Sequence, residues 1–166
     1  MPFTPFHFGP ALLIGFLAWK YLDFPTFVAA SVIVDLRATL VFFDLLSGKL
    51  HGPMHTFAGA FLTAFVLSCM VYLLRDIRSW AMALFRLEQG FSVRKVLAAA
   101  FSGIFLHIVL DSILYADIRP FWPLQANPFL ARGLYGEVYL FCLIGFAATL
   151  PLYLWRSGLY KNFVSK

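Results

Sequence analysis

The sequence predicts an all-α protein, a multi-pass transmembrane helical bundle with about five membrane segments and one interfacial amphipathic helix, folded as a single integral-membrane domain over residues 1–166. Apolar residues make up 61% of the chain and charged residues 13%, whereas a soluble domain carries about 45–50% and about 25%. The apolar residues also gather in runs that approach the roughly 20 residues a spanning helix needs. A water-soluble globule of this size could not cover so much apolar surface, which argues against a soluble enzyme, a disordered tail or a secreted disulfide scaffold.

Five apolar segments follow one another along the chain. The first is short and contains no charged residue before Lys20, so it lacks the positive region of a cleavable signal peptide and is expected to stay in the mature protein. The second carries Asp35 and Arg37 in its middle, the third has no charged residue, and the fourth has a histidine and an aspartate in its second half. The segments are Gly9–Leu22, Pro25–Phe43, Pro53–Leu74, Ser92–Tyr115 and Tyr135–Trp155.

Two connections carry their own patterns. The stretch from Arg75 to Lys95 is amphipathic, because apolar residues recur in it at helical spacing beside arginines, and we expect it to lie on the membrane surface. These apolar residues are Trp80, Leu84, Leu87 and Phe91. The stretch from Ala116 to Leu134 holds three prolines, which exclude a regular helix. Its aromatic residues indicate that it packs over the mouth of the bundle.

The cationic residues are distributed unequally between the two sides of a five-span topology. One face receives nine of the thirteen Lys and Arg residues and the other only three, with Arg37 inside the membrane. The positive-inside rule makes the nine-residue face cytoplasmic, which predicts an N-out, C-in orientation. Because the basic residues sit at the edges of apolar runs, the net charge of +5 reflects topology, and no nucleic acid partner is expected.

The four histidines fall on the outer side of this topology, near two aspartates inside the membrane. His107 and Asp111 are four residues apart and therefore point to the same face of a helix. Asp35 belongs to a polar stripe with Ser31 and Thr39 on the second segment, and His55 begins a similar stripe on the third. Polar stripes in apolar segments face the bundle interior, so the three segments are expected to bring their polar groups together.

Imidazole and carboxylate groups without a thiolate suit zinc, manganese or iron, and they fit a catalytic centre better than a structural zinc knuckle. The sequence therefore predicts a divalent metal site, with zinc as the preferred ion, held by Asp35, His55, His107 and Asp111. Asp117 or Glu137, which lie near the same face, are candidates for the general base or for a supporting carboxylate. An anionic headgroup would be received by one of three cations, Lys49, Arg119 or Arg132.

Two non-enzymatic interpretations of the same residues stay open. His55 and His107 on adjacent helices could ligate haem, or the histidines and carboxylates could relay protons in a small transporter. Alternatively, the groups only pair with one another in a structural assembly factor. A metal-dependent enzyme differs from both, because it requires bound metal and a substrate, which a site at the outer boundary of the bilayer predicts to be a lipid or a lipid-linked molecule.

Several short motifs together resemble one family, the YdjM-like, LexA-regulated, membrane-bound metal-dependent hydrolases of bacteria and archaea. The resemblance spans the chain from His7 to beyond Pro128, and its specificity lies in the order of the motifs. The motifs are Met1–Pro10, Val34–Leu36, His51–Phe57, His107–Asp111 and Pro120–Leu124.

The resemblance implies a hydrolase of the prokaryotic inner membrane, distantly similar to the zinc-dependent phospholipase C and P1 nuclease group, which uses His-x-x-x-Asp pairs to hold zinc and cleave phosphodiesters. It implies that the metal ligands are His7, Asp35, His51, His55, His107 and Asp111. The chain departs from the family after His51, where Gly52 stands in place of the arginine of many members.

The charge bias yields a direct test of orientation. A reporter enzyme that is active only outside the cytoplasm, fused after Lys166, should be inactive, because the bias of nine cations to three places the C-terminus inside. The same reporter inserted between Gln125 and Ala126, in the fourth connection, should be active. The reverse pattern would place the histidines on the cytoplasmic side.

Overall fold

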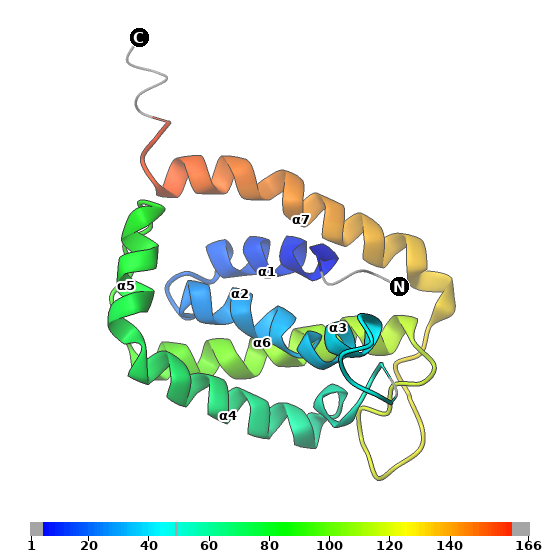
Figure 1. The fold of residues 1–166 in the computed structure, drawn as a ribbon. Helices are drawn as coiled ribbons and strands as arrows, with labels where there is room; N and C mark the ends of the chain where they lie inside the picture. Colours follow the sequence, from blue (N-terminus) through cyan, green and yellow to red (C-terminus); the bar gives the residue numbers. More distant parts are fainter. Residues whose placement is uncertain (1–4, 49, 161–166) are drawn as a thin grey trace.

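The computed structural model describes residues 5–48 and 50–160, and every regular element in that part of the chain is helical (Figure 1). This confirms the predicted all-α class. The helices are α1 (Pro5–Leu17), α2 (Phe24–Ile33), α3 (Leu36–Phe42), α4 (Phe57–Leu73), α5 (Arg75–Leu84), α6 (Val93–Leu114) and α7 (Tyr135–Arg156), with short 3-10 turns η1 (Pro53–His55) and η2 (Arg132–Leu134).

By length and composition, two helices can cross a membrane. They are α6 and the helix of residues Arg132–Arg156, which includes α7. The number rises to four if each of two bent pairs is one span, since α2 and α3 meet at 41° and α4 and α5 at 78°. Helix α1 is apolar but has only 13 residues. The described residues thus contain two to four candidate spans, and the span count of about five stays a prediction.

The helices pack in the order α7, α1, α2, α6, α4, so α6 lies between α2 and α4 (Figure 1). Small residues allow the close approach of α2 and α6. A Cβ atom on Gly103 would lie 2.7 Å from the Cβ of Ala30 and 2.8 Å from the carbonyl oxygen of Phe27. Glycine and alanine at helix contacts are typical of membrane bundles, where backbones approach without a hydrophobic driving force.

Asp35 lies at the break between α2 and α3. Three β-branched residues, Val32, Ile33 and Val34, precede it and weaken the helix. The amide of Asp35 donates to the carbonyl of Val32, three residues back, and its own carbonyl accepts from Thr39 as α3 begins. The Asp35 side chain makes no capping hydrogen bond. Its carboxylate therefore remains available to face the neighbouring helices, whereas Thr39, predicted to continue the polar stripe, is exposed because α3 bends away.

The amphipathic connection is shorter than the sequence predicts. Helix α5 ends at Leu84, and Leu87, expected on the same apolar face, is instead buried against Phe16, Trp19 and Phe24. Trp80 and Leu84 remain exposed, at 67% and 65%. The part of the connection that forms a helix is thus the short α5, which meets α4 at 78°, and its place at the membrane surface stays a prediction.

Arg78 was expected on the polar side of that helix, but it is buried against Asp23 at the start of α2. Its Nη2 atom lies 2.5 Å from Asp23 Oδ1. Gln89 completes the network, because its Nε2 donates to the carbonyls of Trp19 and Leu22 while its Oε1 accepts from Arg78. This network compensates a carboxylate that has no exposed surface.

The segment from Ala116 to Leu134 folds over one end of the bundle, as its aromatic residues predict. The carbonyl of Pro120 accepts a hydrogen bond from the amide of Phe57 at the start of α4. Asn127 donates from Nδ2 to the carbonyls of Ser112 and Tyr115 at the end of α6. In Figure 1 this end also holds α3 and the start of α1, whereas α5 lies at the opposite end.

The Asp23–Arg78 pair should dominate stability at the α5 end. Arg78→Ala should lower the free energy of unfolding by about 3–5 kcal/mol, because it leaves the Asp23 carboxylate buried without a cation. Thermal unfolding in detergent measures the loss. Adding Asp23→Asn should recover part of it, and Arg94→Ala, at an exposed position on α6, should change stability by less than about 1 kcal/mol. Equal losses for Arg78→Ala and Arg94→Ala would contradict this account.

Candidate metal centre

Four residues from three parts of the chain converge in the interior of the bundle. Asp35 comes from the break between α2 and α3, His55 from η1, and His107 and Asp111 from α6. All four are buried, and one ligand-type atom from each can be chosen such that these atoms lie within 4.8 Å of one another. The three polar stripes predict this convergence.

The imidazoles and carboxylates alternate around a common point. His107 Nε2 lies 3.3 Å from Asp35 Oδ1 and 3.2 Å from Asp111 Oδ2. His55 Nε2 faces the same two carboxylates, at 3.4 Å from Asp35 Oδ1 and 3.7 Å from Asp111 Oδ2. Two nitrogens and two carboxylates therefore point toward one small volume.

A hydrogen bond to the backbone of α2 fixes the ring of His107. Its Nδ1 atom lies 2.7 Å from the carbonyl oxygen of Ser31. A carbonyl oxygen can only accept, so Nδ1 carries a hydrogen and Nε2 is the ring nitrogen that faces the centre. Metal-binding histidines usually have such a partner on the second ring nitrogen. Ser31 contributes through its backbone, because its hydroxyl donates to Val28 instead.

The position of His55 depends on the turn before α4. Thr56 caps the helix, its Oγ1 accepting from the amide of Gly59 and donating to the carbonyl of Pro53, which ends η1 with His55 turned inward. His55 precedes the helical span. Burial holds the pKa of His55 below its ordinary value even though the Asp35 carboxylate opposes that shift. The turn before α4 presents this ring to the carboxylates of Asp35 and Asp111.

The donor set fits a metal ion because its buried atoms lack hydrogen bonds among the described residues. The atoms concerned are both ring nitrogens of His55, His107 Nε2 and Asp111 Oδ1. Their neighbours are close, but the contacts do not have hydrogen-bond geometry. Leaving polar atoms unsatisfied in an apolar interior is costly, and a cation at the centre would satisfy His55 Nε2 and His107 Nε2, the two nitrogens that face it.

His7 lies beside this group of four rather than within it. Its Nε2 atom is 3.1 Å from Asp111 Oδ1, the carboxylate oxygen that faces away from His55 and His107. The His7 ring stacks on that of His107 with their centroids 4.1 Å apart. The two oxygens of Asp111 therefore face different histidines, Oδ1 toward His7 and Oδ2 toward His55 and His107.

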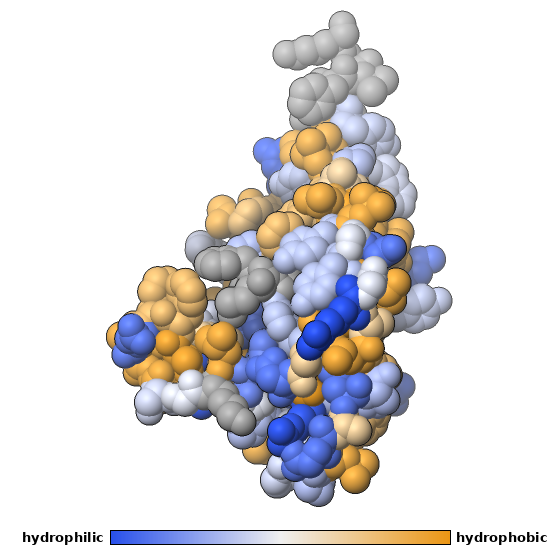
Figure 2. All heavy atoms as spheres, turned by 90° about the vertical axis from the view of Figure 1, so that its right-hand side faces the viewer, coloured by the Kyte–Doolittle hydropathy of each residue, from blue (hydrophilic) through white to orange (hydrophobic). Residues whose placement is uncertain are grey.

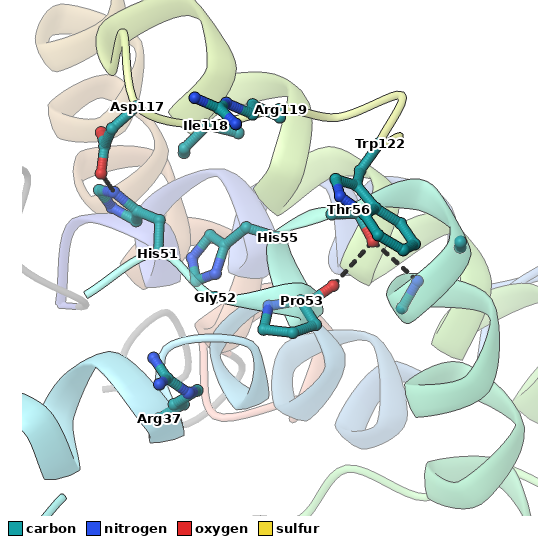
Figure 3. A pocket seen from close by; sticks show the side chains of 12 residues that line it. Arg37, His51, Gly52, Pro53, His55, Thr56, Asp117, Ile118, Arg119 and Trp122 are labelled. Atoms are coloured by element: carbon teal, nitrogen blue, oxygen red, sulfur yellow. Dashed lines mark hydrogen bonds and ion pairs between the residues drawn. The ribbon is translucent and has the colours of Figure 1, made fainter. Parts of the chain in front are cut away.

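His51 and Asp117 form a separate pair on the wall of a pocket that reaches His55 (Figure 3). His51 Nδ1 lies 2.8 Å from Asp117 Oδ2, and the structure does not place His51 in the group of four. The pocket has a volume of about 460 Å³ and also contains Arg119 and Trp122. One of the two predicted catalytic carboxylates thus lies beside the centre.

The remaining predicted residues lie elsewhere. Glu137 is exposed in the first turn of α7 and, within the described chain, neither joins the group of four nor lines the pocket. Arg132 is exposed in η2 and is likewise not among the described pocket residues. Lys49 lies outside the described residues.

Sequence reasoning missed Arg37, which it treated as an intramembrane residue unrelated to the site. Because α3 bends away from α2, Arg37 reaches the pocket wall beside Gly52. The signal in the sequence for this position of Arg37 is the pair of glycines at 48 and 52, because glycines leave room for a large neighbouring side chain. The bond between His51 and Asp117 joins residues 66 positions apart and leaves no local pattern.

The fold and the centre define a class of helical membrane protein with a histidine–carboxylate group that could hold a metal ion. Comparison of sequences adds the family. The chain belongs to the YdjM inner membrane protein family, whose sequence model matches residues 5–163. No match was found among curated proteins or solved structures.

Proposed function

We propose that this protein is a membrane-bound metal-dependent hydrolase that acts on a phosphoester or lipid-linked substrate at the extracytoplasmic boundary of the inner membrane. The main support is the buried group of Asp35, His55, His107 and Asp111, whose ligand-type atoms lie within 4.8 Å of one another. Family membership supports the inner membrane location, and the activity is inferred from the site.

The ligand set of the proposal is two imidazoles and two carboxylates, with His7 beside them. Four nitrogen and oxygen ligands suit zinc, which is therefore the ion proposed. When bound, such an ion supplies a Lewis acid that polarises a phosphoryl or acyl oxygen and makes a water ligand acidic near neutral pH. Haem fits less well, because the carboxylates of Asp35 and Asp111 occupy the space in front of the His55 and His107 nitrogens.

The neighbouring pocket supplies the other groups that hydrolysis needs. In the proposal, Asp117 orients His51, and this pair lies where it can accept or return a proton at the substrate. Glu137 has no role, because it is exposed on α7. The substrate enters from the end where the segment 116–134 covers the bundle, which the N-out, C-in orientation places outside the cytoplasm.

Elemental analysis of detergent-purified protein tests the metal directly. Wild-type protein should retain a stoichiometric divalent metal, and His107→Ala should lose it, because the variant removes one ligand and the Ser31 contact that orients it. Ser102→Ala, at an exposed position on the same helix, is the matched control and should keep wild-type metal content. Wild-type protein that cannot be loaded with any divalent metal would refute the proposal.

Asp111→Asn separates a ligand from a structural charge. If Asp111 binds metal, this variant should lower both the metal content and the rate of hydrolysis of a phosphoester probe by roughly tenfold or more, while the protein still inserts into the membrane. Asp76→Asn, which changes a carboxylate that is 97% exposed on α5, should have no effect. An Asp111→Asn protein with full metal content and raised thermal stability would indicate that Asp111 is only a buried charge whose removal stabilises the fold.

A further inference from the structure

Two arginines line the pocket beside the metal centre, and the proposed ligand set uses neither. Arg37 comes from α3 and Arg119 from the segment that covers the bundle. In Figure 3 they lie on opposite sides of His51 and His55. Because His55 belongs both to the pocket wall and to the group of four, a molecule in the pocket would contact the arginines and the metal centre together.

Gly48 and Gly52 lie against the Arg37 side chain. A Cβ atom on Gly52 would lie 2.9 Å from Arg37 Nη1, and one on Gly48 would lie 3.0 Å from Nη2. Gly48 has a φ of +117°, which residues with a side chain rarely adopt. Both positions therefore leave room for the guanidinium group, which is held at the pocket wall.

The charge of the pocket favours an anion. Its charged side chains are Arg37, Arg119 and Asp117, and the Asp117 carboxylate is engaged by His51 at 2.8 Å. Guanidinium groups bind phosphate and carboxylate oxygens through paired hydrogen bonds. A carboxylate has only two oxygens, whereas the terminal phosphate of a monoester keeps enough unesterified oxygens to contact both arginines and still present one to a metal ion.

We propose that this pocket binds the phosphate group of a phosphate ester, held between Arg37 and Arg119 and presented to the metal centre at His55. The inference rests on the proposed hydrolase function and names its substrate class. Its two arginines are binding residues, distinct from the proposed metal ligands at the α2–α3 break, on η1 and on α6.

The surroundings of the pocket match a phosphate carried by a membrane amphiphile. Exposed apolar side chains occur in the segments that supply the arginines, with Phe43 and Leu45 after α3 at 63% and 73%, and Trp122, which lines the pocket, and Leu124 on the covering segment at 59% and 66%. Figure 2 looks onto this end of the molecule and shows hydrophilic residues gathered between hydrophobic ones. Aromatic and aliphatic residues around a charged site are typical of the headgroup layer of a bilayer.

Calorimetric titration of the full-length, metal-loaded protein in detergent tests the proposal. The probes are inorganic phosphate and the phosphonate analogues of glycerol 3-phosphate and of dihexanoyl phosphatidic acid, which hydrolysis does not consume. Arg37→Ala and Arg119→Ala should each weaken binding of all three by about tenfold or more. Arg119→Lys should recover only part, because a lysine keeps the charge without the paired donors.

Arg132→Ala is the matched control, since it removes an exposed cation in η2 and should change affinity by less than about twofold. If the lipid analogue binds more tightly than the glycerol analogue, the phosphate belongs to a lipid headgroup. If the two bind equally, it belongs to a soluble ester. Wild-type affinity in both alanine variants, or an equal loss in Arg132→Ala, would overturn the proposal. If Arg37→Ala fails to fold, Arg119→Ala and Arg37→Lys test the proposal instead.

Metal content measured on the same samples separates this inference from the proposed function. Arginine variants that retain metal and bind phosphate as well as wild type would refute the phosphate site while leaving the metal centre intact. If wild-type protein takes up no metal, the hydrolase proposal fails, and the arginine dependence of phosphate binding by the metal-free protein still decides the present one.

Discussion

The burial of carboxylates in an apolar helical bundle is the constraint on which the rest of the structure depends. Asp23, Asp35 and Asp111 are at most 7% exposed, and each would be costly without compensation. The bundle deals with them in two different ways at its two ends. At the α5 end, Asp23 meets Arg78 and Gln89 and caps α2 through Thr26. The chain itself satisfies that carboxylate.

At the other end the compensation differs. Asp35 and Asp111 meet only imidazoles at hydrogen-bonding or slightly longer distances, and several of the atoms involved have no hydrogen bond within the described chain. The same molecule thus allows a comparison between one buried carboxylate that is paired with an arginine and two that face histidine side chains. The contrast supports a metal ion as the further partner of the Asp35 and Asp111 carboxylates.

Local spacing carried much of the predictable information. The four-residue spacing of His107 and Asp111 places both on one face of α6, and the apolar runs locate the helices. Features that depend on a bend or on distant contacts could not be anticipated. The break at Asp35 redirects Arg37 into the pocket and Thr39 to the surface, and the end of α5 at Leu84 sends Leu87 into the core. His51 finds Asp117 through tertiary folding alone.

The close contact of Gly103 with Ala30 lies one helical turn before His107, on the same two helices that the bond from His107 to Ser31 joins. The separation of α2 and α6 is therefore part of the geometry that aims His107. A methyl group added at position 103 would push the helices apart and displace the imidazole without touching any ligand. In a mutational scan, Gly103 would then score as severely as a ligand, although it offers no atom that binds metal. Sensitivity to substitution in this bundle reports helix spacing as well as chemistry.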